Sequence, residues 1–277
     1  MACILALAEE VNAELAARGN RARVNDIWLF TVGAGTDPYR RLRTGERWPW
    51  NPVSYYLDTS DFTDQLPGTA IEATLESAYE RWNHVSAAAI RTERITPSVG
   101  NVDIFDGWLD TDPETETTCD SNLDFTADVW TPDFTGFYPV ADVVVGGWLP
   151  PEWFSECLGS EDVIGVTFSL SYGDGDHDHY SDRLYVEQYF NEGFSWVLDG
   201  AQLLGSSVDL ESIAVHEDGH TLGLGHYGGA GKVPEGLFHS YNFDMIFSAE
   251  AVMNPGYLGG EKRDLYSIDR AALRSLY

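Results

Sequence analysis

The sequence predicts an α+β fold, in which a twisted mixed sheet packs against a long helix, a histidine-bearing helix and a C-terminal helix. Three observations predict it. Short runs rich in β-branched and aromatic residues alternate with Gly and Pro-containing loops between residues 53 and 190. Residues 69–88, and again residues from Leu210 onward, place apolar side chains at helical spacing. Hydrophobic residues form 43% of the 277-residue chain, which is enough for a large core.

The first 50 residues are typical of an extension ahead of the main domain. Residues 4–18 fit an amphipathic helix, and residues 24–32 are rich in β-branched and aromatic side chains, as in a strand. A stretch rich in Gly, Pro and Arg follows. We therefore expect a helix–strand extension and linker over residues 1–50, and a single larger domain over residues 51–277.

The larger domain opens with an expected strand at 53–57 and a long helix at 69–88. Thr69 and Glu72 are spaced as a capping box at the start of this helix. Its apolar residues share one face, which predicts packing across a sheet. This face comprises Ile71, Leu75, Ala78, Trp82 and Val85. Further strands are expected at residues 102–105, 143–148, 163–170 and 184–190.

The charge balance limits the partners of the chain. Asp and Glu total 45 against 16 Lys and Arg, which gives a formal net charge of −29. A surface this acidic repels a phosphate backbone, so we expect no nucleic-acid partner. No stretch approaches the roughly 20 apolar residues of a spanning helix, so we expect no transmembrane segment. We expect the chain to act as a monomer.

Three cysteines are too few for the disulfide framework of a small secreted domain. Cys119 and Cys157 lie in loop-like sequence and could form one bridge in an exported protein, or remain unpaired. Cys3 fits a small buried apolar residue. The sequence leaves the state of Cys119 and Cys157 open.

The residues with the clearest chemistry are His216, Glu217 and His220. On a helix, a spacing of four residues stacks the two imidazoles on one face, where both can bind a single tetrahedral ion at about 2.0–2.1 Å. Glu217 then borders the same ion, where a general base is needed. Asp209 is placed to cap the start of this helix after a Gly and Ser-rich stretch.

His226 becomes a third ligand only if the helix ends soon after His220. In a straight helix it would lie about 9 Å farther along the axis, too far to share one ion. Gly223 can adopt the positive φ that ends a helix and turns the chain back, and Gly225 adds freedom. A His-Glu-x-x-His run alone also arises by chance on a helix, and the third histidine argues against that interpretation.

Residues 216–226 resemble the signature of the metzincin zinc metallopeptidases, and Leu-Gly-Leu at 222–224 resembles the matrixin branch. Ala-Val-Met-Asn-Pro-Gly-Tyr at 251–257 is similar to the matrixin Met-turn, and residues 265–277 are similar to the C-terminal helix of that family. The layout resembles bacterial matrixin-like proteins most closely. The resemblance implies a zincin-like fold, Zn²⁺ as cofactor, and a secreted endopeptidase that hydrolyses proteins.

The resemblance also implies a role for individual residues. His216, His220 and His226 would hold Zn²⁺, Glu217 would activate water, and Met253 would form the floor of the site. Pro255 and Tyr257 would wall the primed-side specificity pocket, and Ile164, Gly165 and Val166 would lie on an edge strand that pairs with an extended protein or peptide substrate.

The sequence departs from the family pattern at three points. It has no Pro-Arg-Cys-Gly type segment, so we expect no cysteine switch. Tyr227 stands where matrixins usually carry a small residue, and Asp218 where an apolar residue is common.

Two rival functions are a catalytically silent zinc-binding protein-interaction module and a non-proteolytic zinc hydrolase. The presence of Glu217 argues against the first, and the expected edge strand argues against the second.

A second group of metal-ligand residues lies between the strands at 163–170 and 184–190. It contains Asp174, Asp176, Asp178 and Asp182, with His177 and His179 among them. Oxygen ligands at alternating positions suit Ca²⁺, while a His-x-His pair would suit a structural zinc. A solvated acidic turn explains the same residues. Ca²⁺ is the cation that we expect here.

Overall fold

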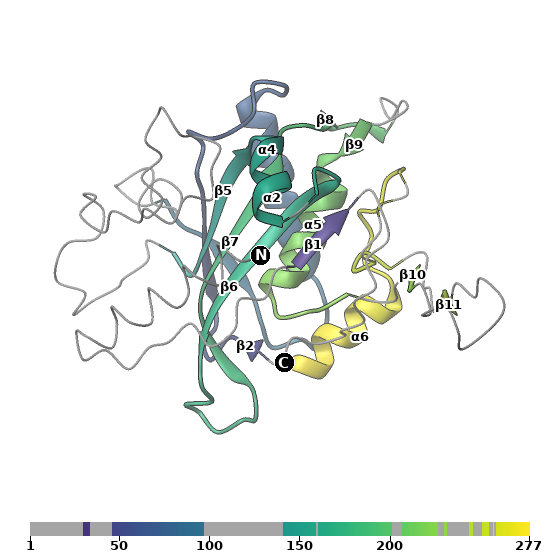
Figure 1. Cartoon of the computed structure of the whole chain (residues 1–277). Coiled ribbons are helices and arrows are strands. Elements are labelled where there is room, and N and C mark those ends of the chain that lie inside the picture. The colour runs from purple at the N-terminus through teal and green to yellow at the C-terminus, as the bar shows by residue number, and fades with distance from the viewer. Residues whose placement is uncertain are drawn as a thin grey trace.

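The structure is a computed structural model of the chain (Figure 1). It describes residues 30–33, 46–96, 141–158, 160–200, 207–226, 230–231, 244–245, 251–254, 257 and 259–277. The helix expected at 4–18 and the strand expected at 102–105 lie outside these residues, as do Cys3 and Cys119.

Within the described residues, seven strands form one mixed sheet in the order β1-β6-β7-β5-β3-β4, with β2 paired to β7. Four of the pairings are parallel, whereas β6 is antiparallel to both β7 and β1. The bounds are β1 Phe30–Gly33, β2 Glu46–Arg47, β3 Val53–Leu57, β4 Thr92–Arg94, β5 Val143–Leu149, β6 Val163–Tyr172 and β7 Ser181–Asn191. The expected combination of helices with a mixed sheet is confirmed.

Two short strand pairs lie apart from this sheet. β8 (Ser195–Val197) is parallel to β9 (Ser207–Asp209), which leads directly into a helix. β10 (Ala230–Gly231) is antiparallel to β11 (Asp244–Met245).

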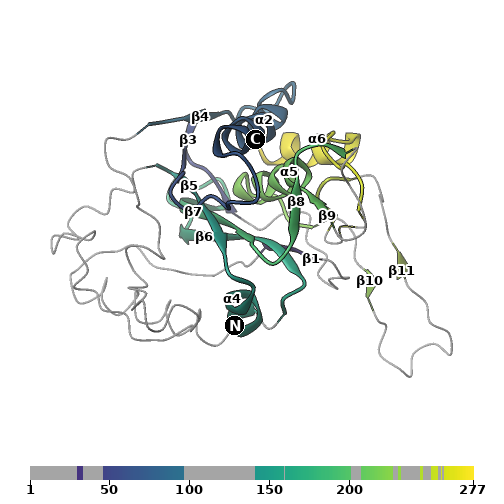
Figure 2. The same cartoon turned by 90° about the horizontal axis from the view of Figure 1, so that it is seen from above.

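The helices in the described residues are α2 (Gly68–Asn83), α4 (Pro151–Trp153) continued by the π-helical turn η2 (Phe154–Leu158), α5 (Leu210–Thr221) and α6 (Ser267–Leu276). Figure 2 shows α2, α5 and α6 on one side of the sheet and α4 on the other. The main core lies between the sheet and the first three helices. A second cluster of Trp153, Phe154, Val166 and Tyr189 packs α4 and η2 against the opposite face.

Helix α2 has the expected buried face but different ends. Its buried stripe includes Ile71, Leu75 and Trp82, and the indole Nε1 of Trp82 donates to the Val215 carbonyl in α5 (2.8 Å). The helix ends at Asn83 rather than at residue 88, because the backbone leaves helical geometry at His84, where φ is −83° and ψ is 2°. The expected capping box is wrong.

The Glu72 carboxylate lies away from the helix start because it is engaged elsewhere. It pairs with Arg94 on β4 at 2.9 Å, and the N-terminal end of α2 has no side-chain cap. A cross-element ion pair therefore replaces the local interaction that the spacing indicated. In the part of the chain described here, none of the helices combines the length and the apolar character needed to span a bilayer.

Residues 46–48, which the sequence places in a linker, join the sheet and the core. Glu46 and Arg47 pair in parallel with Ser181 and Asp182 of β7. Trp48 is buried in the main core cluster. Trp48 also contacts Thr221, the last residue of α5, so residues 46–48 lie close to the end of the helix that carries His216 and His220.

Candidate metal centre

Helix α5 carries two of the three candidate ligands and begins as expected. The Asp209 side chain accepts a hydrogen bond from the Ser212 amide at 3.0 Å, which confirms the predicted cap. Every residue of α5 is buried, and Arg263 pairs with Asp209 and Glu211 at its first turn. The histidines are thus presented from a helix that is enclosed on all sides.

The three histidines converge on one point. Their Nε2 atoms lie 3.1 Å apart between His216 and His226, 3.0 Å between His216 and His220, and 3.0 Å between His220 and His226. The Nδ1 atom of His216 lies 2.7 Å from the Val252 carbonyl oxygen, and that of His220 lies 2.7 Å from the Leu224 carbonyl oxygen. Carbonyls can only accept, so these contacts place the ring protons of His216 and His220 on Nδ1 and leave their Nε2 lone pairs facing inward, toward Nε2 of His226.

This geometry fits a metal ion. The Nε2 lone pairs of His216 and His220 face each other at 3.0 Å and repel unless a cation lies between them, and the 3.0–3.1 Å separations of the three Nε2 atoms are close to the roughly 3.3 Å between tetrahedral ligands at 2.0–2.1 Å from one zinc. Burial lowers the pKa of His216 to about 4, and burial together with the neighbouring histidines lowers the pKa values of His220 and His226. The imidazoles are therefore neutral at pH 7, as metal ligation requires. The triad can hold a metal ion.

The turn that brings His226 back is a Schellman motif. The Leu224 amide donates to the Gly219 carbonyl and the Gly223 amide to the His220 carbonyl, both at 2.9 Å. Gly223 has φ of +90°, as predicted from the sequence. A Cβ atom on this residue would lie 2.8 Å from the Glu46 carbonyl oxygen, so both the conformation and the space require glycine.

Gly223→Ala is therefore expected to weaken both the fold and the metal site. An alanine at positive φ in contact with a backbone oxygen is expected to cost about 1–3 kcal/mol of unfolding free energy, and it displaces His226. The measurements are the denaturant midpoint and zinc affinity, with Gly68→Ala as the control because a Cβ at Gly68 meets no atom within 4 Å. Native zinc affinity in Gly223→Ala would contradict this account of the turn.

Glu217 points toward β6. The residue is fully buried, and its Oε2 accepts a hydrogen bond from the Thr167 hydroxyl at 2.6 Å. A Cβ on Gly165 would lie 2.8 Å from Glu217 Oε1, so the absence of a side chain at this position lets the backbone of β6 approach the carboxylate. The carboxylate is held on the side of α5 that faces the strand expected to bind substrate.

Met253 lies under the helix between the two histidines of α5. A Cβ on Gly219 would collide with the Met253 sulfur, so thioether and helix backbone are in direct contact. Asp269, in the first turn of α6, accepts hydrogen bonds from the Val252 amide (3.1 Å) and the Met253 amide (3.3 Å). The C-terminal helix thereby fixes the turn whose carbonyl contacts His216, a role for Asp269 that the sequence did not reveal.

The expectation that residues 163–170 form an edge strand is wrong. Ile164, Gly165 and Val166 lie on β6 as predicted, but β1 covers the outer edge of that strand. Val32 lies opposite Gly165, and Thr31 opposite Val166, in antiparallel register. β1 also contacts α5, as Figure 1 shows. The sequence indicated a strand in this region but not its partner.

Four other residues singled out in the sequence have mixed outcomes. Tyr257 lies at the start of α5, where its hydroxyl donates to the Gly260 carbonyl (2.7 Å) and accepts from the Asp209 amide (3.2 Å). Pro255 and Tyr227 lie outside the described residues. Asp218 is fully buried and accepts from the Gln188 side-chain amide at 3.1 Å, and burial raises its pKa. Asp218, which stands where matrixins commonly carry an apolar residue, therefore joins α5 to β7 by a hydrogen bond.

The acidic loop between β6 and β7 is partly engaged by its own chain. Oxygen atoms of Asp174, Asp176 and Asp178 lie within 4.8 Å of one another. The Asp174 carboxylate accepts from the backbone amides of Asp178 (2.9 Å) and His179 (3.0 Å), and Asp178 pairs with Arg47 at 3.0 Å. Asp182 is not part of that group, and its carboxylate accepts from the Gly175 amide at 2.8 Å. Ca²⁺ binding stays a prediction.

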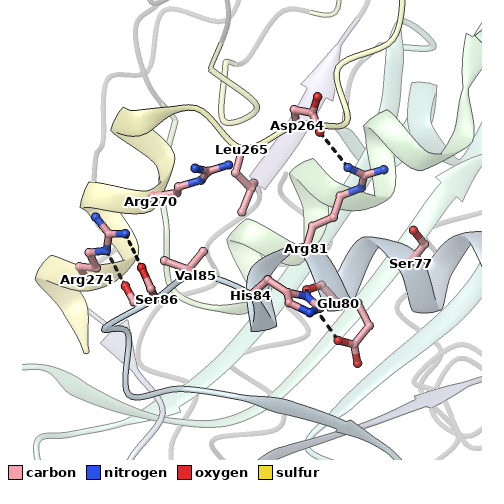
Figure 3. A pocket seen from close by; sticks show the side chains of 10 residues that line it. All are labelled: Ser77, Glu80, Arg81, His84, Val85, Ser86, Asp264, Leu265, Arg270 and Arg274. Carbon is pink, nitrogen blue, oxygen red and sulfur yellow. Dashed lines mark hydrogen bonds and ion pairs between the residues drawn. The ribbon is translucent and has the colours of Figure 1, made fainter.

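A pocket of about 460 Å³ lies between α2 and α6 (Figure 3). Its lining residues do not include the histidine triad. Arg81 pairs with Asp264 at 3.0 Å, and Arg274 donates to the Ser86 carbonyl at 2.7 Å. Because these charged groups are engaged by the walls of the pocket, we assign it no function.

No protein-family model matches the chain, and no significant match is found among curated proteins. The site must therefore be interpreted from its own geometry and from the sequence motif.

Proposed function

We propose that the protein is a zinc-dependent endopeptidase of the metzincin type. The observation that carries the proposal is the convergence of three buried, neutral imidazoles within 3.0–3.1 Å, two of them on the helix that also holds the buried Glu217 carboxylate and the third returned by the turn at Gly223. The proposal combines this geometry with the sequence resemblance over residues 216–226 and 251–257.

Zinc suits the donor set better than a hard cation does. Three nitrogen donors favour zinc and other borderline metals, whereas Ca²⁺ and Mg²⁺ prefer oxygen. His216, His220 and His226 would hold the ion, and the Val252 and Leu224 carbonyls would fix two of the rings. Zinc in such a site supplies Lewis acidity and lowers the pKa of water.

Glu217 would move the proton. As attacking water forms a bond to the scissile carbonyl carbon, one carboxylate oxygen takes the proton from the water. The same carboxyl group then gives it to the amine nitrogen as the C–N bond breaks. The Thr167 hydroxyl, which donates to Oε2 at 2.6 Å, would orient the carboxylate for both transfers.

The substrate would be an extended peptide that pairs with Ile164, Gly165 and Val166 on β6. This strand contacts the Glu217 carboxylate at Gly165 and Thr167, so a peptide paired there would bring its main chain near the carboxylate. Met253 would support the floor, and Pro255 and Tyr257 would wall the pocket beyond the cut. β1 now occupies this edge, so substrate binding would require β1 to leave.

The test is hydrolysis of unfolded casein and of a quenched fluorescent peptide library by the full chain, with and without a zinc chelator. Cleavage that the chelator abolishes and added zinc restores is the expected result. Zinc binding and peptide binding without cleavage would favour the silent interaction module. Hydrolysis of small esters or amides, but not of peptides, would favour another zinc hydrolase.

A further inference from the structure

Arg183 caps the end of α5 that carries the metal ligands. This β7 residue is fully buried, and its Nη1 donates to the carbonyl oxygens of His220 (2.6 Å) and Thr221 (2.7 Å). A helix leaves its last carbonyls without partners inside the helix, and a cation is stabilised at this negative end of the helix dipole. One of the two carbonyls belongs to the ligand His220 itself.

Glu46 links this arginine to the turn at Gly223. Its carboxylate lies 3.1 Å from Arg183 Nη2, and its Oε2 also accepts from the Ser169 hydroxyl at 2.6 Å. Its backbone carbonyl oxygen is the nearest atom to a Cβ built at Gly223, at 2.8 Å. Glu46 therefore contacts both the arginine that holds His220 and the turn that returns His226.

Two further side chains hold the same helix end. The Trp48 indole donates to the Thr221 carbonyl at 2.8 Å, and the Tyr277 hydroxyl donates to the Leu222 carbonyl at 3.2 Å. The same hydroxyl accepts from the Trp48 amide at 3.1 Å. The last three carbonyls before the turn are thus fixed by groups from three distant parts of the chain.

A buried ion pair adds little to the stability of a fold, because the cost of desolvating both charges offsets most of their attraction. A geometric role explains why one is kept here. We propose that Arg183, held by Glu46, is a positioning residue that fixes His220 relative to the Gly223 turn and so sets the affinity of the histidine triad for Zn²⁺. The inference rests on the zinc site of the proposed function, not on peptide cleavage.

The experiment measures zinc affinity in the full chain by competition with a chromophoric chelator. Removing one partner leaves a buried charge, so the main variant is the double change Glu46→Gln with Arg183→Met. It is expected to bind zinc about tenfold more weakly, or worse, which is the usual effect of losing an outer contact of a metal ligand. Arg183→Lys keeps the charge but not the planar fork, and an intermediate loss is expected.

Arg263→Met is the matched control, because Arg263 pairs with Asp209 and Glu211 at the other end of α5. It should lower the melting temperature and leave zinc affinity unchanged. Native affinity in the double variant would overturn the inference, and so would an equal loss in Arg263→Met, which would indicate general loosening of the helix.

Should the double variant fail to fold, Arg183→Lys and Glu46→Gln decide the question. Native zinc affinity in both of these folded variants would overturn the inference. A chain that binds zinc but cuts no peptide, even when β1 is displaced from β6, would reject the endopeptidase, while the zinc affinities of the variants still test the role of Arg183.

Discussion

Replacing Glu217 by glutamine is expected to reduce kcat/KM for peptide hydrolysis by roughly 10²–10⁴-fold, the usual contribution of a general base. The amide cannot take a proton from water, but it can still accept the Thr167 hydrogen bond seen at 2.6 Å. The three imidazoles are untouched. Zinc stoichiometry should therefore remain one per chain, measured by elemental analysis after gel filtration.

Glu211→Gln provides the matched control for this experiment. Glu211 lies on the same helix and pairs with Arg81 and Arg263, away from the ligands. This variant should lose stability and keep its activity. Substantial hydrolysis by metal-replete Glu217→Gln would reject the role of Glu217, whereas equal losses in both variants would point to damage of the helix.

Introducing proline at Val32 is expected to raise peptide binding and hydrolysis at least about tenfold. Val32 lies opposite Gly165 in the β1–β6 pairing, and proline cannot donate a ladder hydrogen bond and fixes φ near −65°. If β1 covers the β6 edge most of the time, weakening it by about 1.4 kcal/mol increases the open fraction about tenfold.

The effect should be measured in two ways. Binding of a labelled extended peptide is compared with and without Val32→Pro in chains that also carry Glu217→Gln, so that cleavage does not interfere. Hydrolysis is compared in chains with Glu217 intact, and Thr31→Val, which keeps strand propensity, is the control. Unchanged peptide binding in the proline variant would mean that β1 does not compete with substrate.

The parts of the site that depend on neighbouring residues could be predicted from the sequence. The Asp209 cap, the i to i+4 histidine pair and the positive φ of Gly223 all follow from backbone geometry over a few residues. The strands at 53–57 and 163–170 were visible because β-branched and aromatic residues cluster there. The convergence of His226 with His216 and His220 follows once the turn is placed.

Features that depend on pairing between distant segments could not be predicted. Ser169 and Glu46 are 123 residues apart in the chain, and no local pattern indicates that they share a hydrogen bond. The pairing of β1 with β6 likewise depends on strand order, which propensity does not encode. The capping box of α2 does not form, and Glu72 pairs instead with Arg94 on β4; the end of the helix at Asn83 is not visible in an apolar pattern that continues to Val85.

The central claim is most directly tested by titrating zinc into the metal-free full chain while peptide cleavage is followed. Activity should rise linearly and reach a plateau at one zinc per chain, and His226→Ala should need a much higher zinc concentration because it lacks one ligand. An active metal-free chain, or a chain that binds one zinc at the triad and cuts no peptide with or without Val32→Pro, would contradict the account.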